Sequence, residues 1–92
     1  MSGQIVESKI NEVRERTDII ELVSQYVDLK RSGANHMGLC PFHSEKSPSF
    51  SVHAGRQFYH CFGCGVGGDV FSFLMQIEGL AFPDAVRRLA ER

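Results

Sequence analysis

Two short pairs of metal-binding side chains constrain this chain of 92 residues more than any other feature. Cys40 and His43 are separated by two residues, and Cys61 and Cys64 repeat that spacing after seventeen intervening residues. A two-residue gap lets a tight turn aim both donors at one ion, and zinc takes four such donors in a tetrahedron. Because four protein ligands leave no open position, the pattern predicts one structural Zn²⁺ rather than a hydrolytic metal.

The remaining histidines are weaker candidates for the fourth ligand. His60, which precedes Cys61, is the main competitor of His43. Neighbouring residues of a strand point to opposite faces, so we expect His60 to face away from the metal. His36 and His53 fall at the ends of expected turns or strands, where a histidine is usually solvated.

The size and composition of the chain fit one metal-stapled domain, residues 1–92. An apolar content of 42% indicates a globular chain, and a core this small often needs a staple. Three cysteines cannot pair off completely as disulfides, which favours metal binding in a reducing compartment. No stretch reaches the ~20 apolar residues of a membrane span or resembles a signal peptide. We therefore expect a cytoplasmic domain with no membrane contact.

Basic side chains gather around the predicted ligands. The net charge is −3 over residues 1–28, +3 over residues 29–65 and −1 over residues 66–92. The cations of the middle segment are Lys30, Arg31, Lys46 and Arg56. A local basic excess is typical of a surface that binds phosphates. The charge pattern alone equally allows a set of solvated side chains with no partner.

The hydrophobic pattern predicts helices at both ends of the chain. Apolar residues recur at helical spacing within residues 5–25, where Asp18 is placed to cap a second short helix. Residues 69–91 show the same spacing, with Asp69 as a helix N-cap and Gly79 as a C-terminal stop. The fold class expected from this arrangement is α+β.

The middle of the chain, residues 26–66, is expected to hold strands and loops. Alternating side chains predict a strand at Tyr26–Lys30, and glycines predict a turn at Gly33–Gly38. Aromatic and β-branched residues predict a hairpin of Ser49–His53 and Gln57–Cys61, joined by a loop of the three residues between them.

Three stretches of this sequence carry a family resemblance: Leu39–His43, Glu45–Phe50 and Phe58–Gly65. They resemble the N-terminal zinc-binding domain of bacterial DNA primases, a CHC2-type zinc ribbon. The likeness extends to residues 18–20, 29–31, 68 and 73–75, so it covers nearly the whole chain.

The resemblance implies a zinc ribbon, in which a small antiparallel β-sheet carries the metal and helices flank it. In such primases this domain contacts the single-stranded DNA template and helps select the sites where RNA primers start. A separate RNA-polymerase domain, acting in cis or in trans, makes the primer, and another region engages the replicative helicase. The chain then corresponds to the N-terminal fragment of a longer primase and has no active site of its own.

Template binding requires cations that follow phosphates and rings that stack on bases. We assign these roles to Lys30, Arg31, Lys46, Phe50, Arg56, Phe58 and His60. Pairing His53 with Gln57 would place Phe50, Val52, Phe58 and His60 on one sheet face, which we favour as the template face. The alternative is that this more apolar face packs against the helices.

One position departs from the family pattern. Relatives often carry a basic residue where this chain has Ala34, which removes one possible phosphate contact. Two other functions also remain open at this stage. The chain could be a structural or protein-docking zinc ribbon, or the equivalent domain of a phage or plasmid primase-helicase.

Overall fold

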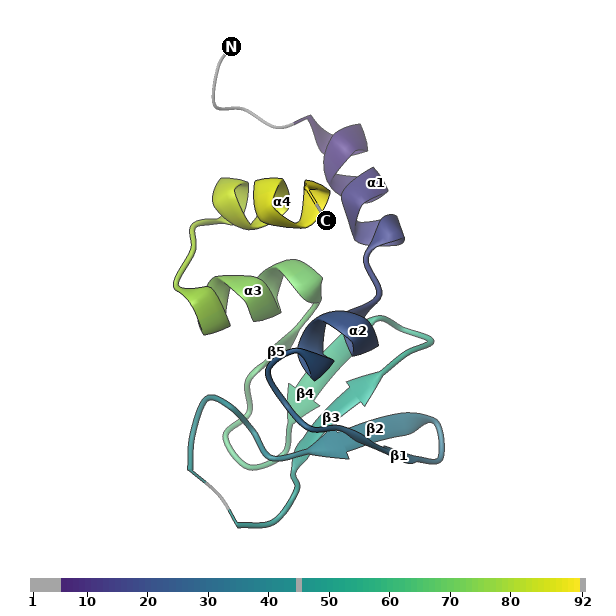
Figure 1. Ribbon diagram of the computed structural model, residues 1–92, viewed down its shortest axis with the longest axis vertical. Coiled ribbons are helices and arrows are strands. Elements are labelled where there is room, and N and C mark those ends of the chain that lie inside the picture. The colour runs from purple at the N-terminus through teal and green to yellow at the C-terminus, as the bar shows by residue number, and fades with distance from the viewer. Residues whose placement is uncertain (1–5, 45, 92) are drawn as a thin grey trace.

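The computed structural model describes residues 6–44 and 46–91 (Figure 1). It confirms an α+β fold in which helices at both ends of the chain flank an antiparallel sheet. The helices are α1 (Glu7–Arg16), α2 (Ile19–Ser24), α3 (Val70–Glu78) and α4 (Phe82–Ala90). The strands are β1 (Lys30–Ser32), β2 (Asn35–Gly38), β3 (Phe50–His53), β4 (Phe58–Cys61) and β5 (Gly67–Gly68). None of the helices in these ranges is long and apolar enough to cross a membrane.

The helix ends follow the capping signals of the sequence. The Asp18 carboxylate accepts a hydrogen bond from the backbone N–H of Ile20 at 3.0 Å, and Asp69 accepts one from Ser72 at 3.0 Å. Gly79 ends α3 in the left-handed conformation, with a φ of 67°, which a residue without Cβ adopts at little cost. These three residues confirm the predicted starts of α2 and α3 and the predicted end of α3.

The sheet has the strand order β1-β2-β3-β4-β5, with every neighbouring pair antiparallel. In Figure 1 the helices lie above the sheet, with α2 and α3 nearest to it and with α1 and α4 farther away. The core between sheet and helices is aromatic: Phe50, Tyr59 and Phe73 are fully buried. Their ring centroids lie 5.5 to 6.2 Å apart, within the range of favourable ring pairs.

The first hairpin differs from the sequence-based expectation. The predicted strand at Tyr26–Lys30 begins only at Lys30, because the N–H groups of Tyr26 and Val27 still bond to the carbonyl of Val23 at the end of α2. The predicted turn at Gly33–Gly38 is confined to its first two residues, and the remainder forms β2. Gly33 alone, at a φ of 62°, supplies the left-handed conformation that this tight turn needs.

The second hairpin is shifted by one residue from the predicted pairing. Its loop has four residues, Ala54–Gln57, and His53 pairs with Phe58 rather than with Gln57. Gln57 belongs to the loop because its backbone has a φ of 53°, while its side-chain amide bonds to the N–H of Ile19 and to the carbonyl of Ala54. Such a shift moves every side chain of one strand to the opposite face of the sheet.

Candidate metal centre

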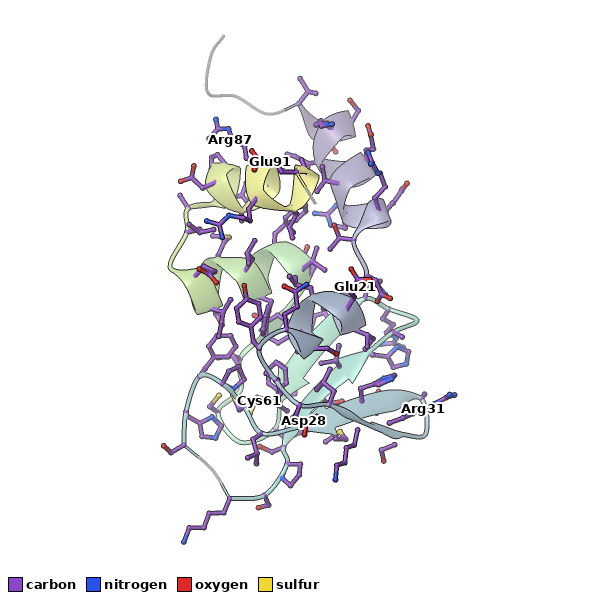
Figure 2. The ribbon with its side chains drawn as sticks, viewed as in Figure 1. Glu21, Asp28, Arg31, Cys61, Arg87 and Glu91 are labelled. Atoms are coloured by element: carbon purple, nitrogen blue, oxygen red, sulfur yellow. The ribbon has the colours of Figure 1, made fainter. Side chains whose placement is uncertain are left out.

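The predicted zinc ligands come together at one end of the sheet. Cys40 follows β2, His43 lies in the next turn, Cys61 ends β4 and Cys64 lies in the turn before β5. The strand register causes this meeting, because Phe50 of β3 pairs both with the end of β2 and with Cys61. One donor atom from each ligand residue lies within 4.8 Å of the others. Figure 2 shows Cys61 at this end of the molecule, away from α1 and α4.

The spacing of the sulfur atoms fits a tetrahedral zinc ion. The Sγ atoms of Cys40 and Cys64 are 3.8 Å apart. Two sulfurs that each bind one zinc at ~2.3 Å with a tetrahedral angle are separated by about 3.8 Å. Backbone N–H groups also point at the sulfurs, from Phe42 to Cys40 at 3.4 Å and from Gly63 to Cys61 at 3.3 Å. Such donors stabilise thiolates, which are the form of cysteine that binds metal.

The thiols differ in how readily they lose a proton. Burial raises the pKa of Cys40 to about 12. Burial also raises the pKa of Cys61, but hydrogen bonds from the Ser49 hydroxyl and from the backbone of Cys64 and Gly63 outweigh it and lower that pKa to about 7. Of these two thiols, Cys61 reaches the metal-binding form at the lower pH, and zinc has to displace the proton of Cys40.

The other histidines lie apart from this cluster. His60 pairs with Ser51 on the sheet face opposite to Cys61, and its ring lies 4.8 Å from the ring of Phe62. His53 accepts a hydrogen bond from the backbone N–H of Arg56 within the second hairpin loop. The four donors that the structure brings together are thus the four that the spacing predicted.

Comparison with known proteins identifies this arrangement. Residues 5–92 match the family model described as CHC2 zinc finger. The chain belongs to the CHC2 zinc finger family. It is 57% identical over 91 residues to a DNA primase of Enterococcus faecalis, which covers 99% of this chain and 14% of that primase. It is 54% identical over 83 residues to a DNA primase of Thermotoga maritima, with 90% and 15% covered.

A solved structure agrees with this assignment. The CHC2 zinc finger superposes with a TM-score of 0.89 on the crystal structure of the Aquifex aeolicus primase, which comprises zinc-binding and RNA-polymerase domains. The sequence identity is 40%, and the match covers 95% of this chain and 22% of that chain. The CHC2 zinc finger thus corresponds to the zinc-binding domain of bacterial DNA primases, spanning 14% to 15% of its curated relatives. With its Cys/His/Cys/Cys cluster, it carries one structural Zn²⁺.

The residues predicted to contact DNA do not all share one surface of the CHC2 zinc finger. The four cations are exposed: Lys30 and Arg31 lie in β1, Lys46 in the loop before β3, and Arg56 in the second hairpin loop. Phe58 is 44% exposed and His60 half-buried, and both lie on the sheet face that points away from the core.

The prediction that Phe50 lies on the template face is wrong. Its ring is fully buried with Val52 and Tyr59, whereas Phe58 and His60 share the opposite face with Ser51 and His53. The cause is the four-residue loop, which moved β4 by one position relative to β3. Phe50 is therefore part of the core, and its ring is not accessible to a DNA base.

Sequence reasoning missed Phe62, whose side chain is 73% exposed. Its backbone N–H bonds to the carbonyl of Ser49 at 2.9 Å, so it continues the β3–β4 ladder beyond Cys61. The alternation Phe58, His60, Phe62 is visible in the sequence, but the expected strand ends at Cys61 and leaves out the third ring.

Proposed function

We propose that this chain binds single-stranded DNA on the outer face of its sheet and helps a DNA primase select the sites where RNA primers begin. The observation that carries the proposal is a row of three rings, Phe58, His60 and Phe62, on the face away from α2 and α3. We call this row the aromatic row. Rings in such a row are what sequence-tolerant single-strand binders use to stack bases.

The backbone beside the aromatic row leaves the rings accessible. Gly67 of β5 pairs with His60, and a Cβ atom there would lie 3.2 Å from its Nδ1 and 3.5 Å from the Phe58 ring. Glycine therefore keeps this edge free of a side chain that would crowd both rings. Alternate residues of a strand are roughly 7 Å apart, so an extended single strand can place successive bases along the row.

Cations border the same face. Lys30 pairs with Met37, Met37 with Ser51, and Ser51 with His60, so these residues form one row across the sheet. Lys30 therefore lies at the β1 edge of the face that carries the aromatic row. Arg56 lies in the loop next to Phe58. Neither cation forms an ion pair with an acid in the part of the chain that the structure describes. Both charges are thus available to phosphates.

The proposal places this chain in a longer enzyme. RNA primer synthesis would belong to a separate polymerase domain, acting in cis or in trans, and contact with the replicative helicase to a further region. The residues of this chain would recognise template and make no phosphodiester bond, and the whole primase would work in the cytoplasm. The primase relatives and the structural match to a chain that contains an RNA-polymerase domain support this role.

Removal of either exposed ring is expected to weaken binding to a single-stranded oligonucleotide. Phe58→Ala and Phe62→Ala should each cost ~1–3 kcal/mol of binding free energy, because each removes one stacking platform. Fluorescence anisotropy with a labelled oligonucleotide measures the loss. Phe82→Ala is the matched control, since Phe82 is also partly exposed but lies in α4, where its ring contacts Phe71. Equal affinities for all three variants and the unchanged chain would contradict the proposed face.

Neutralising Arg56 is expected to flatten the salt dependence of that binding. Arg56→Ala should reduce the slope of log affinity against log salt by about 1, because one phosphate contact releases about one counterion. Arg87→Ala, in the exposed surface of α4, should leave the slope unchanged. An unchanged slope for Arg56→Ala would mean that Arg56 does not contact a phosphate of the DNA.

A further inference from the structure

A groove of about 590 Å³ opens beside the first hairpin, at the opposite edge of the sheet from the aromatic row. Its apolar surface comes from Val27, Met37, Leu39, Pro41 and Pro48. Leu39 is 48% exposed, so its side chain is accessible to a ligand in the groove. Ligand pockets commonly have volumes of ~300–1,000 Å³ and predominantly apolar linings. The groove therefore has the size and surface of a small-molecule site.

Close backbone packing forms one wall of the groove. Gly38 lets the segment before β1 lie directly on β2, because a Cβ atom there would come within 2.8 Å of the Asp28 carbonyl and 2.9 Å of Val27 Cγ1. The other wall is formed by Pro41, Lys46 and Pro48, which follow the zinc ligand Cys40 in the chain. The metal thus fixes one wall and a glycine fixes the other.

The rim of the groove is cationic. Lys30, Arg31 and Lys46 line it, and none of them forms an ion pair with an acid among residues 6–44 and 46–91. Arg31 donates a long 3.4 Å hydrogen bond to the carbonyl of Gly33. Among the lining residues that the structure describes, Asp28 is the one carboxylate, so their positive charge exceeds their negative charge. In Figure 2, Asp28 and Arg31 lie on the sheet, far from Arg87 and Glu91 on α4.

We infer that this groove binds a nucleoside triphosphate, with the base on the apolar floor and the phosphates at Lys30 and Lys46. The inference rests on the proposed function, because nucleoside triphosphates are the substrates of template-directed RNA synthesis. Arginine and lysine side chains are the usual partners of phosphate oxygens, and an apolar floor binds a base or ribose better than it binds a bare anion. A groove of this volume suits one nucleotide better than an extended strand or an acidic peptide, either of which needs a longer groove.

The position of the groove allows template and nucleotide to bind together. The groove lies at β1 and β2, and the aromatic row lies on β4. Three strand spacings separate β1 from β4, a distance of about 14 Å. Lys30 and Met37 belong to the same cross-strand row as Ser51 and His60, so this part of the groove shares a face with the aromatic row.

The test is a titration of the zinc-loaded chain with ATP, adenosine and inorganic triphosphate, followed by NMR and calorimetry. ATP should bind at least tenfold more tightly than either fragment, and shifts should concentrate at Lys30, Met37 and Leu39. Lys46→Ala should weaken ATP binding about tenfold, as expected for one charge-assisted contact. Asp28→Asn should strengthen it several-fold, whereas Arg87→Ala should change nothing.

The outcomes separate this inference from the proposed template site. Because Lys30 borders both sites, a saturating single-stranded oligonucleotide should weaken ATP binding only partly, and Lys46→Ala should leave the effect of Phe62→Ala on oligonucleotide binding intact. Equal affinity for ATP and inorganic triphosphate, or complete displacement of ATP by the oligonucleotide, would overturn the nucleotide site while leaving the aromatic row in place. If the zinc-loaded chain binds ATP but does not bind the oligonucleotide, the proposed function is overturned instead.

Discussion

Removal of zinc is expected to unfold the sheet end of the molecule while leaving part of the helical structure. Binding free energy of a structural zinc is also folding free energy, of order 10 kcal/mol in small zinc peptides. Two of the ligands, Cys40 and Cys61, belong to the buried core, so the loss extends beyond the loops. Val13 of α1 and Leu89 of α4 are buried away from the metal end and should preserve some helix.

Amide dispersion of residues 37–66, measured by NMR before and after chelation, reports this loss. Cys61→Ser should reproduce the loss at saturating zinc, because it removes one ligand. His60→Ala is the matched control, since it changes the adjacent residue on the opposite face and should keep stoichiometric zinc. Complete dispersion after verified removal of zinc would show that the metal does not organise the fold.

Truncation of Phe50 is expected to cause the largest loss of stability with the zinc site intact. Phe50 is fully buried and lies between Tyr59, Phe42 and Phe73, with ring centroids 5.5 to 6.2 Å away. Phe50→Ala should lower the free energy of unfolding by about 3–5 kcal/mol, through lost burial and the cavity that remains.

Chemical denaturation of zinc-saturated protein measures this change, and Phe62→Ala provides the comparison. Phe62 is 73% exposed, so its truncation should change the free energy of unfolding by less than ~1 kcal/mol. Nearly equal stabilities for the two variants would mean that the sheet faces are assigned the wrong way round.

The local signals of the sequence predicted much of this structure. Spacing identified the cluster of Cys40, His43, Cys61 and Cys64, because a two-residue gap limits where two donors can point. Asp18 and Asp69 predicted helix starts because their carboxylates satisfy N–H groups that the helix itself leaves unpaired. Each of these features depends on residues close together in the chain.

The features that depend on strand register were not predictable in the same way. The left-handed backbone of Gln57 adds one residue to the loop. The Gln57 side chain accepts a hydrogen bond from the N–H of Ile19, a residue distant in the sequence, and this bond helps to keep Gln57 in the loop. That one residue decides whether Phe50 or Phe58 faces the core. The groove beside β1 likewise depends on how the segment before β1 packs on β2, at Val27 and Gly38.

The most direct test of the central claim is an NMR titration of the zinc-loaded chain with a single-stranded oligonucleotide. The proposed function predicts that the largest amide and ring shifts fall at Arg56, Phe58, His60 and Phe62, and that they diminish as salt rises. Shifts confined to α1 and α4, or no shifts at low salt and millimolar oligonucleotide, would contradict a template-binding role for this face of the sheet.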